Sequence, residues 1–448
     1  MIFSVYTIIF LFKVDFFFLF YYIHFLILFI TFFKGTVSVL LNNKRIVITG
    51  LGVVTPIGVG NEAFWKAASN GKNGVLPLEL FDATDFKTKT GGEVRDFNAP
   101  DHLSQREIDM MGRSSQFAVA AARMALSDSS LDLQNIDTQR VALSMGTTMG
   151  EPQILEEGVK IKYQNNDIEK IPSSLPGKYP CSTIPANVAR ALRIKGPHTM
   201  IPTACAAGNY AIGYGYDLIK LGKADIVFAG GSDPFSGIAF TGFNRLLATT
   251  EDIVRPFDKN RSGMAVSEGA GVIILETLEH ALSRNAPIYA ELLGYGLGCD
   301  AFKMTIPDPS GSGGIIALRR CIENSGIKPE EIDYICAHGT GTGENDKTET
   351  FVVKEVLGEK AYSTPVSSLK SMLGHTMGAA SAIEAASCAM MIKNQTILPT
   401  INYQTPDPNC DLDYVPNSAR AKEINTVVSN AYAFAGNTSS IALRRYQG

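Results

Sequence analysis

The chain has 448 residues, of which 45% are hydrophobic and 19% are charged, and its formal net charge is −4. This length and apolar content exclude a disordered chain and predict one large domain or two intimately packed ones. The slight negative charge argues against a nucleic-acid-binding protein. The seven cysteines show neither zinc-site nor disulfide spacing, so we expect a reducing compartment and no metal centre.

Residues 1–36 differ in composition from the rest. Phe16 to Phe33 is an almost unbroken apolar run of 18 residues, just long enough to cross a bilayer. No small-residue cleavage site follows it, so it does not read as a secretory signal peptide. Two interpretations stay open: an anchor that tethers a cytoplasmic protein to the membrane through residues 16–33, or untranslated upstream sequence wrongly assigned as coding, with the true start near residues 37–41.

From residue 44 onward, strand-like and helix-like segments alternate, which predicts an α/β protein with parallel sheets. The first part of the chain is expected to hold strand 45–50, helix 108–126, strand 139–143, helix 211–221 and strand 225–231. The second part is expected to hold strand 331–336, helix 378–392 and strands 426–430 and 439–444.

The second part repeats the pattern of the first. Strand 331–336 runs into a Gly/Thr-rich turn, as strand 139–143 does, and a small-residue helix follows a short apolar segment in both parts. We therefore predict two halves, residues 44–286 and 287–448, with an active site where they meet.

Cys205 stands among small residues, between a strand-like and a helix-like segment. A helix that begins there would favour the thiolate, the form in which a cysteine acts as a nucleophile. Taken alone, a small buried cysteine in a tight turn explains the motif equally simply. What favours the catalytic interpretation is a pair of histidines, His338 and His375, each in a glycine-containing turn far downstream.

Several motifs together resemble the β-ketoacyl-acyl-carrier-protein synthases, the elongating condensing enzymes of the thiolase-like superfamily. They occur in the family's order, and the likeness extends from about Lys44 to the C-terminus. The motifs are Thr203–Gly208 around Cys205, Arg255–Asp258 with Glu268–Gly271, His338–Thr342, and Lys370–His375 with Glu384.

The resemblance implies a thiolase-like α/β fold of two duplicated βαβαβαββ halves in a layered αβαβα arrangement. It also implies a homodimer that condenses an acyl chain on Cys205 with malonyl-acyl-carrier protein, with loss of carbon dioxide. The only cofactor it implies is the phosphopantetheine that the carrier protein brings. A heterodimer with a related subunit stays open.

The chemistry of that reaction matches the residue types. A thiolate accepts the acyl group, and the enolate formed by decarboxylation needs hydrogen-bond donors, which neutral His338 and His375 could supply. By resemblance, Lys370 organises His375 and a water, and Glu384 holds Lys370; the alternative is an ordinary buried ion pair.

By resemblance too, Thr340 and Thr342 hold the phosphopantetheine arm, although both could simply satisfy their own turn. Phe434 occupies the gatekeeper position of a loop that reads Tyr432–Thr438, where two family glycines are alanines, so we expect a stiffer hinge. Ser115 falls where an aliphatic residue often closes the acyl pocket. Together with the altered turn after His338, it predicts a synthase of polyketide, aryl-polyene or nodulation type that accepts long or unsaturated chains.

Two other functions are weighed against this one. A thiolase would have a second cysteine where this chain has His375, and a non-catalytic chain-length-factor-like subunit would lack Cys205. Because a carrier protein is acidic, we expect a basic docking patch, to which Arg245, Lys259 and Arg261 could contribute.

Overall fold

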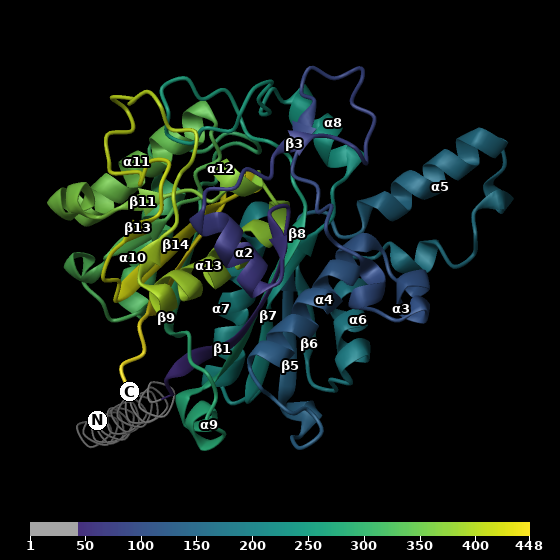
Figure 1. Ribbon diagram of the computed structural model, residues 1–448, viewed down its shortest axis with the longest axis horizontal. Coiled ribbons are helices and arrows are strands. Elements are labelled where there is room, and N and C mark those ends of the chain that lie inside the picture. Colours follow the sequence, from purple (N-terminus) through teal and green to yellow (C-terminus); the bar gives the residue numbers. More distant parts are fainter. Residues whose placement is uncertain (1–43) are drawn as a thin grey trace, which may run out of the picture. The chain divides into compact units, whose positions relative to one another are not determined.

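The structure, a computed structural model, describes residues 44–448, so the apolar run at 16–33 lies outside the described residues. Residues Arg45–Gly448 form one compact unit around an eleven-stranded sheet, shown in Figure 1. No helix within residues 44–448 combines the length and the apolar character needed to cross a membrane. The strands are β1 (Ile46–Thr55), β2 (Gly58–Val59), β5 (Val141–Gly146), β6 (His198–Ile201), β7 (Ile226–Asp233), β8 (Gly269–Thr277), β9 (Ala290–Cys299), β10 (Tyr334–Cys336), β11 (Val366–Ser367), β14 (Thr426–Tyr432) and β15 (Asn437–Arg444).

The sheet consists of two halves with the same strand order. One half runs β6-β5-β7-β8-β1 and the other β11-β10-β14-β15-β9. In each, the first three strands are parallel and the last two antiparallel to their neighbours. The halves join where β1 pairs antiparallel with β9. The predicted duplication of the fold is thus confirmed at the level of topology.

Helices cover both halves of the sheet in three layers (Figure 1). Two central helices, α7 (Ala207–Lys220) and α13 (Ala380–Asn394), pack against each other and against strands of both halves. Outside the first half lie α4 (Arg113–Asp128) and α6 (Thr183–Leu192), and outside the second lie α10 (Ser312–Asn324) and α11 (Gly343–Leu357). This is the αβαβα layering that the resemblance implied.

The two central helices approach closely because their facing residues are small. A Cβ atom on Gly208 of α7 would lie 2.5 Å from the backbone nitrogen of Ala382 and 2.7 Å from the hydroxyl of Ser381, both on α13. Helix α13 is buried along nearly its whole length. A bulkier residue at Gly208 would therefore separate the helices that follow the candidate catalytic segments.

The helix expected at 108–126 is wrong as a single element. The structure has α3 (Gln105–Met110) and α4, separated by Met111 and Gly112, which are both extended. A Cβ on Gly112 would lie 2.3 Å from a carboxylate oxygen of Glu151. The apolar spacing of the sequence continues across this break, because the partly buried Ile108 of α3 packs against the same core as the buried residues of α4.

Candidate active site

Cys205 lies in the tight connection between β6 and α7. Its 3₁₀ turn, Ala204–Ala206, begins with Ala204 in the left-handed region at φ 52°. The segment has little room, since a Cβ on Gly146 of β5 would come within 2.4 Å of the Ala207 carbonyl group. Cys205 itself is buried. The small residues around Cys205 thus allow a strained turn to pack against the central sheet.

His375 lies in the corresponding connection of the second half, between β11 and α13. A short helix, α12 (Lys370–Leu373), precedes it, and a 3₁₀ turn, Met377–Ala379, follows. Met377 is left-handed at φ 54°, as Ala204 is in the first half. His338 follows β10, the counterpart of β5, in the Gly/Thr-rich turn.

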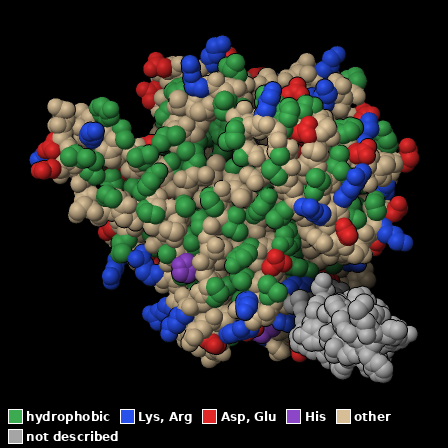
Figure 2. Space-filling model, turned by 180° about the vertical axis from the view of Figure 1, so that it is seen from behind, with side chains coloured by type: hydrophobic (Ala, Val, Ile, Leu, Met, Phe, Trp, Pro, Cys, Tyr) green, Lys and Arg blue, Asp and Glu red, His purple; other side chains and the backbone are tan. Residues whose placement is uncertain are grey.

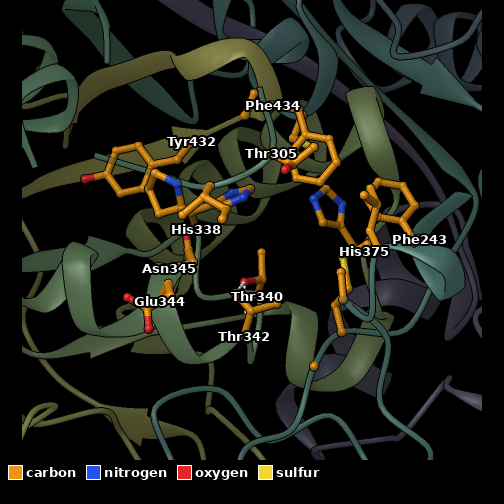
Figure 3. Close-up of a pocket in the computed structure, with 18 of the residues that line it drawn as sticks. Phe243, Thr305, His338, Thr340, Thr342, Glu344, Asn345, His375, Tyr432 and Phe434 are labelled. Carbon is orange, nitrogen blue, oxygen red and sulfur yellow. Dashed lines mark hydrogen bonds between the residues drawn. The ribbon is translucent and has the colours of Figure 1, made fainter. Parts of the chain in front are cut away.

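The three side chains converge on one place. Donor atoms of Cys205, His338 and His375 all lie within 4.8 Å of one another. The two imidazole rings are 5.4 Å apart, nearly perpendicular, and both project into one cavity (Figure 3). This cavity, of about 370 Å³, is lined by residues of both halves, including Phe243, Thr340 and Phe434. The three side chains thus meet at the junction of the two halves, where we predict the active site.

Both histidines are neutral. Burial lowers the pKa of each imidazole well below its ordinary value, and the nearby Lys370 ammonium lowers it further. The backbone N–H of Met377 donates to Nδ1 of His375 at 3.1 Å. Because Nδ1 therefore carries the lone pair, the ring proton of His375 sits on Nε2. The Nδ1 atom of His338 has no hydrogen-bond partner among the described residues.

The thiol of Cys205 does not have the lowered pKa that its position before a helix predicts. Burial raises the pKa of Cys205 to about 12, and the Lys370 charge acts in the opposite direction without cancelling this effect. The backbone N–H groups of Cys205 and Phe434 also point to the sulfur and favour the thiolate. Desolvation thus outweighs the helix terminus, and the resting residue is a thiol.

Lys370 and Glu384 form a buried ion pair. The ammonium group lies 2.5 Å from Oε1 of Glu384, and both side chains are 2% exposed. Burial raises the pKa of Glu384 to about 7, while Lys370 acts to lower it. The second carboxylate oxygen, Oε2, has no hydrogen-bond partner among the described residues. The pair places a positive charge beside both histidines and the cysteine.

Of the four predicted substrate-binding residues, Thr340, Thr342 and Phe434 line the cavity and Ser115 does not. The hydroxyls of Thr340 and Thr342 lie 2.9 Å apart on the cavity wall. The ring of Phe434 lies 5.3 Å from that of Phe243 at the same cavity. Ser115 is fully buried on α4 and is not among the residues that line the cavity.

The surroundings of Ser115 are polar and occupied. Its backbone N–H donates to Glu151, and its hydroxyl accepts a hydrogen bond from Asn187 at 2.9 Å. Glu151 is fully buried, and burial raises its pKa to about 7. The space that a small residue leaves on α4 is therefore at least partly taken by these two side chains.

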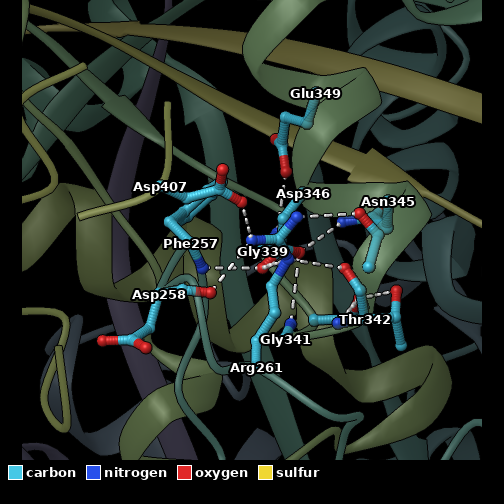
Figure 4. A network of polar contacts seen from close by, with 12 residues as sticks. Phe257, Asp258, Arg261, Gly339, Gly341, Thr342, Asn345, Asp346, Glu349 and Asp407 are labelled. Atoms are coloured by element: carbon cyan, nitrogen blue, oxygen red, sulfur yellow. Dashed lines mark hydrogen bonds and ion pairs between the residues drawn. The ribbon is translucent and has the colours of Figure 1, made fainter. Parts of the chain in front are cut away.

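Polar groups behind the cavity hold the turn that carries His338 (Figure 4). Glu349, buried on α11, accepts the backbone N–H groups of His338 and Gly339, each at 2.8 Å. Asp346 of the same helix accepts those of Phe257 and Gly341. Sequence reasoning missed both acids, although their position just after the His338 motif was a usable signal.

Arg261 belongs to this network and is not free to dock a partner. Its side chain is only 7% exposed, lies 2.5 Å from a carboxylate oxygen of Asp407, and donates to the carbonyls of Thr342 and Gly343. Two buried carboxylates hold it in place, which corrects its expected place in a basic docking patch. Arg245 and Lys259 are exposed, as is Lys303 at the cavity.

Among the described residues, Cys205, His338 and His375 are the one group whose donor atoms come close enough to hold a metal ion. Sulfur and imidazole are donors that zinc prefers. A metal would need the Nε2 lone pair of His375, but the bond from Met377 leaves the proton on that atom. The tautomer therefore suits a hydrogen-bond donor and not a metal ligand.

Comparison with known proteins identifies the family. The family model "Beta-ketoacyl synthase, N-terminal domain" matches residues 43–281, and "Beta-ketoacyl synthase, C-terminal domain" matches residues 289–404. A curated relative, the 3-oxoacyl-[acyl-carrier-protein] synthase 2 of Synechocystis, is 39% identical over 419 residues, which is 91% of this chain and 99% of the relative.

Solved structures agree. The ishigamide ketosynthase/chain length factor is 41% identical, with a TM-score of 0.86 over 90% of this chain and 100% of that chain. The ketosynthase complex AntDE:AntF, a type II polyketide synthase with its acyl-carrier protein, is 36% identical with a TM-score of 0.84 and the same coverage. The duplicated thiolase-like fold, the converging Cys205, His338 and His375, and these matches show that the chain belongs to the β-ketoacyl synthase family of condensing acyltransferases.

Proposed function

We propose that this enzyme is a β-ketoacyl-acyl-carrier-protein synthase that elongates acyl chains in fatty-acid or polyketide synthesis. It takes an acyl group onto Cys205 and condenses it with malonyl-acyl-carrier protein. The convergence of one thiol and two neutral imidazoles in a buried cavity carries the proposal. The substrates arrive as thioesters of the carrier protein's phosphopantetheine, and no other cofactor takes part.

The first step is transfer of the acyl group. The sulfur of Cys205 forms a bond to the acyl carbon, and the bond from that carbon to the phosphopantetheine sulfur breaks. The thiol proton of Cys205 leaves with the departing thiol. The N–H groups of Cys205 and Phe434, which already point to the sulfur, are placed to stabilise the developing oxyanion.

The second step is decarboxylative condensation. Malonyl thioester loses carbon dioxide, and its α-carbon attacks the acyl carbon on Cys205, which releases the cysteine sulfur as a thiolate. This thiolate takes up a proton from water to restore the resting thiol. The enolate oxygen formed on the way accepts hydrogen bonds from His375 Nε2–H and from His338. Neutral imidazoles suit this role, because a buried donor with no net charge needs no counter-ion at rest.

Lys370 and Glu384 play a supporting part. The Lys370 ammonium favours the Cys205 thiolate and adds to the effect of burial in lowering the pKa of both histidines. The Glu384 carboxylate pairs with this buried charge. Thr340 and Thr342 hold the phosphopantetheine arm at the cavity wall, and Phe434 with Phe243 gates the acyl chain. Ser115 stays part of the proposed acyl-chain specificity, acting through Asn187 and Glu151.

The acyl-carrier protein is the proposed partner at the cavity mouth. Exposed Lys303 and the exposed apolar residues Leu246, Leu247 and Met304 line that cavity, and exposed Arg245 directly precedes Leu246 in the chain. Arg245→Glu should raise the apparent KM for carrier-bound substrate and leave the use of acyl-CoA unchanged. An equal effect on both substrates would reject the docking role.

A second subunit is the other proposed partner. Helix α5 (Pro152–Asn165) projects from the molecule (Figure 1), and hydrophobic side chains spread from that projection across the face seen in Figure 2. Leu155, Val159, Ile168 and Tyr179 on and beside α5 are exposed. Such a surface supports a homodimer, or a heterodimer like the ketosynthase/chain length factor. Sedimentation of the protein alone and with a related subunit separates the two.

The decisive experiment is intact-mass analysis with a panel of acyl-carrier proteins. The enzyme should gain the mass of one acyl chain on Cys205, and malonyl-acyl-carrier protein should then discharge it with release of carbon dioxide. His338→Ala and His375→Ala should keep acylation and lose condensation. Acylation by no carrier of the panel would instead favour a non-catalytic chain-length-factor-like subunit, and condensation that persists in Cys205→Ala would reject Cys205 as the nucleophile.

A further inference from the structure

Asp233 is a buried acid that the mechanism above does not use. It ends β7 in the first half of the fold, and it is 1% exposed. Its carboxylate accepts hydrogen bonds on both oxygens. The donors are the hydroxyl of Thr147 at 2.7 Å and the backbone N–H groups of Thr148 at 2.7 Å, Met149 at 3.1 Å and Gly378 at 2.7 Å.

These donors come from two different halves of the molecule. Thr147, Thr148 and Met149 belong to the turn after β5, whereas Gly378 belongs to the turn after His375. The fit around Gly378 is tight, since a Cβ there would lie 2.7 Å from Oδ2 of Asp233 and 2.5 Å from the carbonyl carbon of Thr147. The Asp233 carboxylate thus joins the turn after β5 in the first half to the turn that follows His375 in the second half.

The turn that Asp233 holds is strained and chemically important. Met377 is left-handed at φ 54°, a conformation that a residue other than glycine adopts only when its surroundings hold it. The same residue donates its N–H to Nδ1 of His375, which sets the tautomer of that ring. Gly378, the next residue, is the one bound to Asp233. If the turn relaxed, the donor to Nδ1 would move away.

We propose that Asp233 is a positioning residue for condensation: by holding the Met377–Gly378 turn, it keeps the proton of His375 on Nε2, directed to the substrate. The inference rests on the proposed role of His375. It predicts that loss of the carboxylate impairs the step that uses the histidine and does not slow the step that uses only Cys205, because the Asp233 charge raises the pKa of the Cys205 thiol.

The test compares both steps in Asp233→Asn, which keeps the shape of the side chain. The four donors now bind two carboxylate oxygens, but the amide of Asn has only one oxygen and presents an N–H group in place of the other. Acylation of Cys205 is followed by intact mass with a hexanoyl thioester of pantetheine, and condensation by release of carbon dioxide from malonyl-pantetheine. Condensation should lose at least about tenfold in kcat with little change in KM, while acylation stays within about threefold.

Asp258→Asn is the matched control, because Asp258 is also fully buried and accepts the backbone N–H groups of Asn260, Gln404 and Thr405, away from His375. It should not separate the two steps. Asp233→Glu, which retains the carboxylate, should restore condensation at least in part. If Asp233→Asn does not fold, Thr147→Val removes one donor to the same carboxylate at constant shape and should show the same selective loss on a smaller scale.

A second readout is the tautomer itself. Nitrogen-15 NMR of labelled histidine should find Nδ1 of His375 unprotonated in the native enzyme and a mixture of tautomers in Asp233→Asn. Native condensation in Asp233→Asn, or equal losses in both steps, would overturn the inference. If the native enzyme is never acylated at Cys205, the proposed function fails instead, and the tautomer measurement still tests the effect of Asp233 on the ring.

Discussion

The sulfur of Cys205 is subject to opposing influences, and their balance decides how the enzyme starts its cycle. Burial and the Asp233 charge disfavour the thiolate, whereas the Lys370 charge and two backbone N–H groups favour it. Burial is the largest of these effects, so the residue rests as a thiol. A resting thiol is protected from oxidants and alkylating agents until a thioester enters, because the thiolate is the reactive form.

This balance predicts the pH dependence of alkylation. With a pKa of about 12, the thiolate fraction of Cys205 rises tenfold per pH unit throughout the neutral range. Iodoacetamide should therefore modify Cys205 at a rate that increases about tenfold per pH unit, without a plateau below about pH 10. Peptide mass mapping follows Cys205, with exposed Cys299 as the internal reference. A plateau near pH 7 would show that the thiolate already predominates.

The Lys370–Glu384 pair predicts a large effect on stability. Glu384→Gln leaves the Lys370 ammonium buried beside a neutral group, so the free energy of unfolding should fall by about 3–5 kcal/mol. Asp411→Asn breaks the partly exposed Lys354–Asp411 pair and should cost no more than about 1 kcal/mol. Urea unfolding of the two variants measures the difference. Similar losses in both would mean that Lys370 finds another partner.

The residues that sequence reasoning found are those whose chemistry is tied to a motif. Cys205, His338 and His375 could be predicted because each lies in a turn of distinctive composition. The resemblance placed Lys370 beside His375, but the effect of its charge on Cys205 and the bond from Gly378 to Asp233 could not be predicted, because both join distant segments of the chain. Arg261 was misassigned for the same reason: its carboxylate partner Asp407 is far along the chain.

At the scale of elements, the loop 433–438 tests the expectation of a stiff hinge. Ala435 is left-handed at φ 63°, and Ala433 is extended at φ −139°. Ala435 therefore occupies a conformation that favours glycine, and Ala433 does not. The loop is held in this form by contacts to the neighbouring segment, including the bond from the Ala435 N–H to the Met304 carbonyl.

The same substitution at these two positions should have opposite consequences. Ala435→Gly removes the left-handed strain and should leave the protein as stable or up to about 1 kcal/mol more stable, whereas Ala433→Gly should destabilise it by about 0.5–1 kcal/mol. Chemical denaturation of both variants provides the measurement. A loss at Ala435 as large as that at Ala433 would show that the strain is negligible.

Element boundaries were predicted less well than element types. The helix expected at 108–126 breaks at Met111 and Gly112, where the Glu151 carboxylate requires close approach of the backbone. The sequence carries no periodic sign of this break, because Ile108 of α3 packs against the same apolar core as α4. The central helices were predicted more closely, since their small-residue composition is continuous.

At the scale of the whole molecule, duplication explains why residues 170 positions apart in the chain meet. Each half contributes one central helix, α7 or α13, which begins at a strained turn beside a candidate catalytic residue. The two helices pack face to face, and the cavity opens near their N-terminal ends. Catalytic geometry therefore depends on how closely the helices approach, and that distance is set by small residues such as Gly208.

The close approach predicts that Gly208→Ala harms both stability and activity. The added methyl group would meet the backbone of Ala382 at 2.5 Å, so α7 and α13 must separate, at a cost of about 1–3 kcal/mol in unfolding free energy. Because Cys205 precedes α7 and His375 precedes α13, the rate of condensation per folded molecule should fall as well, beyond what the loss of stability explains.

Gly242→Ala is the matched control. Gly242 lies in helix α8 (Gly237–Arg245), where a Cβ would meet nothing within 4 Å, and the change should stabilise the protein slightly and leave activity intact. Native condensation in Gly208→Ala would mean that the two halves can shift relative to each other without disturbing the site.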